Sequence, residues 1–210
     1  MSYAHWLVIP SSIISIGGSY TYIRDTLSGK TKPNRISWLM WSVAPFIGMA
    51  AALSANADYW VTVRVFLSGF LPLLIFFASF LNPKSYWKLT LFDIICGACS
   101  VLALIVWLII DSPQAAILLA VIGDGFAALP TIRKAWKFPE TETGITYFAG
   151  FVSVVLIIPS IPVWNIENSA FQIYLLIANA FLFIAVYRQR LLPRLKKSIA
   201  TSNSREIDLI

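Results

Sequence analysis

Long apolar stretches alternate with short polar links along this chain. Seven stretches of roughly 20 mainly apolar residues are bounded by charged residues, proline or asparagine: 4–26, 36–55, 59–81, 86–110, 114–135, 144–164 and 169–188. A helix of roughly 20 apolar residues is long enough to cross the hydrocarbon core of a bilayer. The pattern therefore predicts an all-α integral membrane protein with seven transmembrane helices.

The composition supports the same fold class. Of the 210 residues, 58% are hydrophobic and 12% are charged, and the mean hydropathy is +0.75. Soluble domains carry about 25% charged residues. The links are too short to form a sizeable domain outside the membrane, so we expect the function to lie between the helices.

The positive charges are distributed unevenly among the links. The first, third, fifth and last polar segments hold 15 of the 16 positive residues: Arg24, Lys30, Lys32, Arg35, Lys84, Lys88, Arg133, Lys134, Lys137, Arg188, Arg190, Arg194, Lys196, Lys197 and Arg205. Cytoplasmic links are enriched in Lys and Arg. This alternation predicts an N-terminus outside and a C-terminus in the cytoplasm.

The net charge of +6 therefore reports topology rather than a nucleic-acid partner. The basic segment from Arg188 to Lys197 is suited to anionic lipid. Residues 198–210 are polar, and we expect them to be disordered.

The sequence also predicts an internal repeat. Ile23-Arg24 aligns with Ile132-Arg133, and Ile36-Ser37-Trp38 aligns with Ile145-Thr146-Tyr147, both without gaps and at an offset of 109 residues. The offset places the first three stretches on the last three and leaves the fourth unpaired. Both copies begin outside, which predicts parallel three-helix repeats (1–82 and 113–192), a linker helix in 83–112 and a tail in 193–210.

This organisation resembles the PQ-loop and SWEET transporter superfamily. The best-matching piece is the helix end at Pro130-Thr131, followed by a basic turn and a Gly144-Ile145-Thr146 restart. The family has Pro-Gln where this chain has Pro130-Thr131, and the first copy has Thr21-Tyr22. The resemblance implies transport by alternating access between the two repeats.

Two polar residues lie near mid-membrane depth. Asp124 is central in the fifth stretch, between Gly123 and Gly125, and Asn179 is central in the seventh. An ionisable residue in a membrane is costly and is by default a candidate functional group. The alternative interpretation is that both residues hydrogen-bond neighbouring helices and only hold them together.

Other residues complete the predicted pocket. The resemblance implies that a mid-membrane Asn of the seventh helix contributes to the substrate site, and Asn179 matches that depth. Its pseudo-equivalent region in the third stretch is Ser68-Gly69-Phe70, so a symmetric Asn is missing, which argues against a sugar site copied from the family. Trp41 is deep enough in the second stretch to line the cytoplasmic half of the pocket.

Two further charges lie inside apolar stretches. We expect Asp93 to lie about seven residues inside the cytoplasmic end of the fourth helix, where it either pairs with Lys88 or Arg133 or relays protons. Arg64 lies about one turn below the outer surface of the third helix. It either extends its charge to the interface or forms an outer gate.

Four prolines fall within the predicted helices: Pro45, Pro72, Pro130 and Pro159. Each removes a backbone hydrogen bond and permits a bend. They are candidates for hinges around a central cavity, or for static kinks.

The sequence offers little support for an enzyme or a photoreceptor. Cys96 and Cys99 have redox-like spacing but are the only cysteines, and they lie on an apolar helix where a thiol is a poor nucleophile. The only histidine is His5, so no histidine-based metal site is expected. The last helix has no lysine for a retinal Schiff base. We expect no catalytic residue, metal or cofactor.

The sequence thus predicts a small-solute transporter in a membrane, most consistent with a bacterial inner membrane. Asp124 would bind the solute or a coupling proton, and Asn179 would orient the solute. The alternative is a ligand-binding receptor or sorting protein of the same fold that does not transport.

Overall fold

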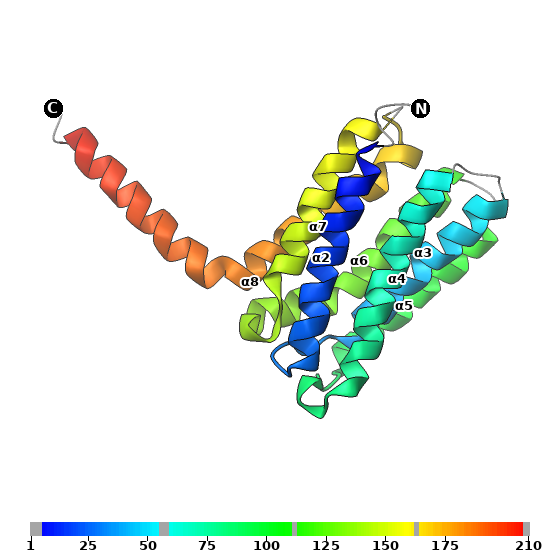
Figure 1. The fold of residues 1–210 in the computed structure, drawn as a ribbon, viewed down its shortest axis with the longest axis horizontal. Helices are drawn as coiled ribbons and strands as arrows, with labels where there is room; N and C mark the ends of the chain where they lie inside the picture. The colour runs from blue at the N-terminus through cyan, green and yellow to red at the C-terminus, as the bar shows by residue number, and fades with distance from the viewer. Residues whose placement is uncertain (1–5, 55–58, 111–112, 162–163, 208–210) are drawn as a thin grey trace.

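The computed structural model describes residues 6–54, 59–110, 113–161 and 164–207. Side chains are not described for 47–65, 113, 116, 160, 167–168 and 191–207. Within these ranges the fold is all-helical (Figure 1). The α-helices are α2 (Val8–Leu27), α3 (Arg35–Ser54), α4 (Tyr59–Leu81), α5 (Leu91–Ile109), α6 (Pro113–Lys137), α7 (Gly144–Ile157) and α8 (Ile166–Ile207).

Each described helix overlaps one predicted apolar stretch, but the start of α5 and the end of α7 differ from the prediction. α5 begins at Leu91 rather than near 86, because Thr90 forms a capping box with Asp93. α7 ends at Ile157, and Pro159 lies in the short 3-10 helix Ile158–Ser160 that follows. A proline cannot donate the backbone hydrogen bond that would continue the α-helix.

The prediction of disorder after residue 198 is wrong, because α8 runs to Ile207. In Figure 1 this last part of α8 projects away from the other helices. The residues just before it, Leu195, Lys196 and Lys197, favour helix, as do Ala200, Arg205 and Glu206 within it. Extending an existing helix also costs less than starting a new one.

The helices pair in a regular way. α4 contacts both α2 and α3, and α8 contacts both α6 and α7. Between these two groups of three, α2 packs against α7 and α3 packs against α6. The remaining helix, α5, packs on α6 and α3. Figure 1 shows a bundle in which consecutive helices run in opposite directions, so α2 runs parallel to α4 and α6 runs parallel to α8.

Close approach of α2 and α7 depends on Gly18. A Cβ atom at this position would lie 2.6 Å from the Cβ of Ala149, which is too close for real side chains. The Thr146 hydroxyl donates to the Gly18 carbonyl at 2.8 Å. Small residues therefore bring the two groups of helices into contact at this interface.

Three links that contain or directly follow clusters of Lys and Arg meet at one end of the bundle. The amide of Lys32 donates to the carbonyl of Thr141 at 3.0 Å, and Asn82 Nδ2 donates to the carbonyl of Leu27 at 2.8 Å. Gly29 turns the chain after α2 with a φ of 80°, a conformation that favours glycine. We call this end, which holds the links 28–34, 82–90 and 138–143, the basic end.

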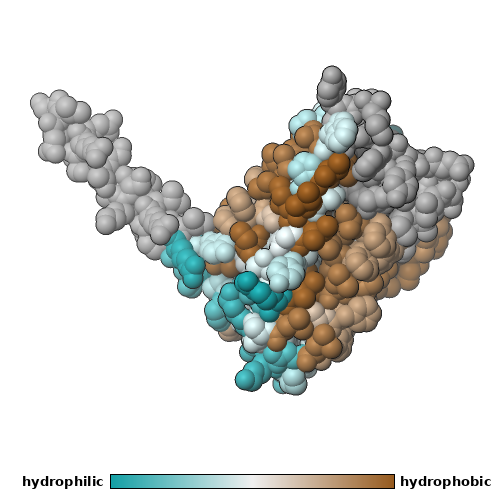
Figure 2. Space-filling view, viewed as in Figure 1, coloured by the Kyte–Doolittle hydropathy of each residue, from teal (hydrophilic) through white to brown (hydrophobic). Residues whose placement is uncertain are grey.

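The outer surface of the bundle is strongly apolar. α5 alone exposes eight large aliphatic side chains: Leu91, Ile94, Ile95, Val101, Leu102, Ile105, Leu108 and Ile109. Figure 2 shows an apolar surface over the middle of the molecule and hydrophilic residues toward the basic end. Soluble monomers rarely expose apolar patches of this extent.

Two helical segments of the described chain are long and apolar enough to cross a membrane: Leu91–Ile109 and Ser169–Arg190. Phe66–Leu81 and Gly144–Ile157 are apolar but shorter. The described part of the chain is therefore compatible with a membrane protein.

Candidate functional site

A cavity of about 210 Å³ lies among six of the seven helices. Side chains of α2, α3, α4, α6, α7 and α8 line it, whereas α5 contributes none of its described lining. The residues that line the cavity include Ser12, Ser15, Ser19, Trp38, Trp41, Pro45, Leu67, Ser68, Leu71, Pro72, Asp124, Tyr147, Gly150, Ser153, Val154, Phe171, Tyr174, Leu175, Ala178 and Asn179.

The structure brings together the four residues that the sequence singled out for solute or proton binding. Asp124 of α6, Asn179 of α8, Trp41 of α3 and Ser68 of α4 all line this cavity. Asp124 is 7% exposed. Residues from four separate helices thus converge on one space.

Asp124 lies opposite Tyr174 of α8, and the two side chains interact electrostatically. The Tyr174 hydroxyl is buried and makes no hydrogen bond that meets normal distance and angle limits. The flanking glycines differ in role. A Cβ at Gly123 would crowd Ala103 and Ser100 of α5, whereas a Cβ at Gly125 would lie at an ordinary 3.8 Å from Tyr174.

Asn179 is held from two sides. Its Nδ2 donates to the carbonyl of Leu175, one turn earlier, at 2.9 Å. Its Oδ1 occupies the space where a Cβ would stand at Gly150 of α7. The glycine therefore leaves room for the Asn179 amide at the edge of the cavity.

Substituting Gly150 with alanine should turn the Asn179 amide away, because the added methyl group would overlap Oδ1. An amide is the flexible end of its side chain, so we expect the fold to tolerate the change. We expect affinity for a solute that Asn179 contacts to fall up to about tenfold, as for one lost hydrogen bond. Isothermal titration in detergent measures this.

Gly17→Ala is the matched control, because nothing lies within 4 Å of a Cβ at Gly17. It should leave solute affinity unchanged. Equal affinity of the Gly150→Ala and wild-type proteins would show that the amide does not need this position.

Serine side chains form one wall of the cavity, between α2 and α7. The hydroxyls of Ser11 and Ser153 are 2.6 Å apart, and Ser15 Oγ donates to Ser153 Oγ at 2.9 Å. These bonds join the two groups of helices. Ser12 and Ser19 also line the cavity from α2.

Aromatic side chains form another part of the wall, toward the basic end. Trp38 and Trp41 meet edge to face with ring centroids 5.0 Å apart. The Trp38 indole donates to the hydroxyl of Tyr22 at 3.3 Å, and the Tyr22 and Trp38 rings are 4.7 Å apart. The aromatic wall thus continues into a polar network.

Glu142 is the centre of that network. Its Oε2 accepts hydrogen bonds from Tyr22 at 2.8 Å and from Tyr147 at 2.7 Å. Its Oε1 lies 2.6 Å from Lys134 Nζ, and the side chains of Lys134 and Glu142 are 1% and 0% exposed. Lys134 also donates to the carbonyl of Lys32. The network therefore joins α2 and its following link to α6 and α7.

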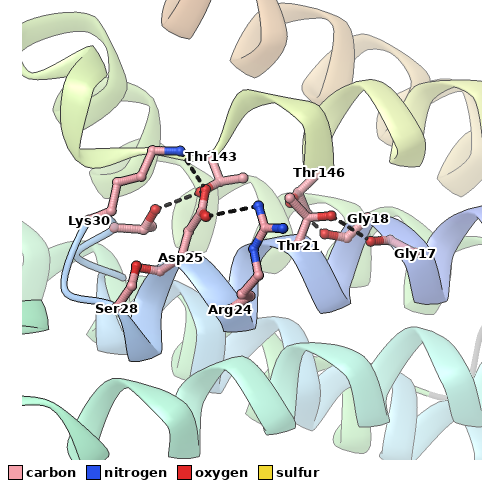
Figure 3. Close-up of polar contacts among 10 residues, drawn as sticks. Gly17, Gly18, Thr21, Arg24, Asp25, Ser28, Lys30, Thr143 and Thr146 are labelled. Carbon is pink, nitrogen blue, oxygen red and sulfur yellow. Dashed lines mark hydrogen bonds and ion pairs between the residues drawn. The ribbon is translucent and has the colours of Figure 1, made fainter.

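Asp25 forms a second connection at the same end (Figure 3). Its Oδ2 accepts from Lys30 at 2.8 Å and from Thr143 at 2.9 Å, and Oδ1 lies 3.4 Å from Arg24. The Thr143 hydroxyl is also 2.5 Å from that of Thr31. We call the Glu142 and Asp25 clusters together the basic-end network.

The cavity lining follows a regular spacing along the chain. In α3 and α7 three pairs of lining residues are each separated by 109 positions: Trp38 and Tyr147, Trp41 and Gly150, and Pro45 and Val154. In α4 and α8 four pairs are each separated by 107 positions: Leu67 and Tyr174, Ser68 and Leu175, Leu71 and Ala178, and Pro72 and Asn179. At this spacing Asn179 is paired with Pro72.

Asp93 does not lie seven residues inside its helix, as the sequence predicted. It lies in the first turn of α5, and its Oδ2 accepts from the Thr90 amide at 2.6 Å and from the Thr90 hydroxyl at 3.0 Å. Among the described ion pairs, none joins it to Lys88 or Arg133. The hydropathy pattern began the helix too early, so Asp93, which is buried, lies in the first turn of α5 and not two turns inside it.

The other predicted positions divide as follows. Pro45, Pro72 and Pro130 lie inside α3, α4 and α6, and the first two line the cavity. Pro159 lies outside α7, so it is not a hinge within that helix. Pro130 and Thr131 are fully buried. Arg64 belongs to α4, but its side chain lies outside the described residues.

The sequence did not point to the basic-end network. Glu142 lies in a polar link, where a carboxylate is ordinary, and Tyr22 and Tyr147 lie among other aromatics. Two signals were available: Asp25 falls inside the apolar stretch 4–26, and Lys134 falls inside the stretch 114–135. Lys134 was counted as a topology marker.

Comparison of the chain with models of protein families, with curated proteins and with solved structures found no match. The function is therefore argued from the residues themselves.

Proposed function

We propose that this protein is an integral membrane transporter for a small polar solute, built from two parallel three-helix repeats with α5 as linker. The observation that carries the proposal is the cavity between the two groups of helices, with Asp124 and Asn179 in its lining. Polar groups at this depth cost free energy, so they are by default candidates for a functional role. The resemblance to the PQ-loop and SWEET superfamily, including its alternating access, belongs to this proposal.

Two features support the repeats. The third helix of each group lies between the other two: α4 contacts α2 and α3, and α8 contacts α6 and α7. The contacts between groups are also reciprocal, since α2 meets α7 and α3 meets α6. The spacings of 109 and 107 residues in the cavity lining agree with a duplication that lost two residues between α7 and α8.

The basic-end network supports alternating access. It joins the two proposed repeats on one side of the cavity through Tyr22, Asp25, Thr143 and Glu142. By the positive-inside rule this is the cytoplasmic side. We infer that the network closes the cytoplasmic path and that it opens for solute release. Asp124 is then the group that binds solute or a coupling proton.

Counterflow into vesicles tests this function. Purified protein is first screened for thermal stabilisation by amino acids, sugars, amines, nucleosides and vitamins, because a ligand of the folded state raises stability. Vesicles loaded with the best stabiliser should then accumulate labelled solute transiently, whereas vesicles without protein should not. Heat-inactivated protein is the second control.

A stabilising solute that shows no counterflow would contradict transport. It would instead support the alternative, a receptor or sorting protein with the same cavity. An inner-membrane location in bacteria is part of the proposal and is tested by fractionation.

A further inference from the structure

The charge in the cavity indicates which solute it takes. Asp124 is the one carboxylate among the described lining residues, and these include no Lys, Arg or His. Asp124 is 7% exposed, and the cationic Lys134 is already paired with Glu142. A carboxylate in a dry site is stable only with a counter-charge or a proton. The described lining supplies no counter-charge, so a bound cation would complete the site.

Aromatic rings favour the same kind of ligand. Trp38, Trp41, Phe171 and Tyr174 line the cavity, and Tyr174 lies beside Asp124. An ammonium group is attracted to aromatic faces, more strongly where water is excluded. The Tyr174 hydroxyl faces Asp124, so a ligand bound to the carboxylate would also meet this hydroxyl.

The remaining polar lining is uncharged. Ser12 and Ser19 contribute hydroxyls from α2, and Asn179 contributes its amide. These groups can bind the hydroxyls of a solute, but they cannot neutralise a carboxylate that the solute itself brings in addition to Asp124. An amino acid would bring such a carboxylate into the cavity without a basic partner.

We propose that the cavity binds a small hydroxylated organic cation, an amino alcohol or amino sugar, with its ammonium group on the Asp124 carboxylate between aromatic rings and its hydroxyls on Asn179 and the α2 serines. This proposal rests on the proposed function, which places the solute in the cavity. It adds the charge of the solute and its chemical class.

Ligands matched in size but different in charge test the proposal. One set is glucosamine, glucose and glucuronate, and the other is ethanolamine, ethylene glycol and glycolate, with serine as a zwitterion. Binding to the purified protein is followed by tryptophan fluorescence, because Trp38 and Trp41 line the cavity, and by thermal stabilisation. In at least one set the cation should bind about 10- to 100-fold more tightly than its neutral and anionic partners.

Asp124→Asn should remove most of this preference. The control is Glu140→Gln, which makes the same change in net charge at an exposed link residue and should keep the preference. The wild-type comparison needs no variant, so it decides the proposal even where Asp124→Asn does not fold.

Equal or tighter binding of a neutral or anionic member, tight binding of serine, or no binding of either cation would overturn the proposal. Counterflow of a neutral solute would overturn it while leaving the transporter function intact. Conversely, cation binding that depends on Asp124 but gives no counterflow would retain the ligand class and contradict transport.

Discussion

Replacing Glu142 with alanine is expected to destabilise the folded protein by about 3–5 kcal/mol, the range for removing one partner of a buried ion pair. Lys134 and Glu142 are 1% and 0% exposed, so the remaining ammonium group would lie buried without its anion. The hydroxyls of Tyr22 and Tyr147 would also lose their acceptor. Denaturant titration in detergent micelles measures the free energy of unfolding.

Glu140→Ala is the matched control, because Glu140 is an exposed carboxylate two residues away. It should change stability by less than about 0.5 kcal/mol. The double variant Lys134→Met with Glu142→Gln should recover part of the loss, since replacing both ions removes the unpaired charge. A loss below about 1 kcal/mol in Glu142→Ala would mean that the ion pair does not stabilise the fold.

The helices could be predicted from the sequence because apolar length is a property of each segment alone. Each of the seven helices coincides with one apolar stretch. The errors lie at the ends of the helices, because specific side chains determine where a helix begins and ends. Thr90 and Asp93 cap α5 later than hydropathy suggests, and a proline ends α7 earlier.

The candidate site could be predicted only where a residue contrasts with its surroundings. Asp124 and Asn179 stand out in apolar stretches, and both line the cavity. Glu142 has no such contrast, and its importance comes from partners 8 and 120 positions away, at Lys134 and Tyr22. Such contacts depend on how α2, α6 and α7 pack, which no local pattern contains.

The proposed repeat shows the same limit. A 109-residue offset relates two short matching segments of the sequence, and it also separates three pairs of cavity-lining residues in α3 and α7. Cavity-lining residues of α4 and α8 are separated by 107 positions instead. Under the proposed repeat Asn179 would therefore match Pro72, a change in offset that the two matching segments do not contain.

A cross-link between Thr31 and Thr143 is expected to stop transport almost completely. Their hydroxyls are 2.5 Å apart across the basic-end network, and the residues are 0% and 5% exposed. Cysteines at both positions have their sulfur atoms close enough to form a disulfide. The bond would hold α7 to the link after α2, so the cytoplasmic path could not open. The cavity lining is unchanged, so solute binding should remain.

The experiment uses a background in which Cys96 and Cys99, the two native cysteines, are replaced by serine. Counterflow is measured after oxidation and again after reduction, together with the extent of cross-linking. Oxidation should abolish counterflow in Thr31→Cys with Thr143→Cys, and reduction should restore it. Each single variant should transport under both conditions. Full counterflow in the cross-linked protein would show that solute passes without separation of the two repeats at the basic end, and alternating access through this network would then be wrong.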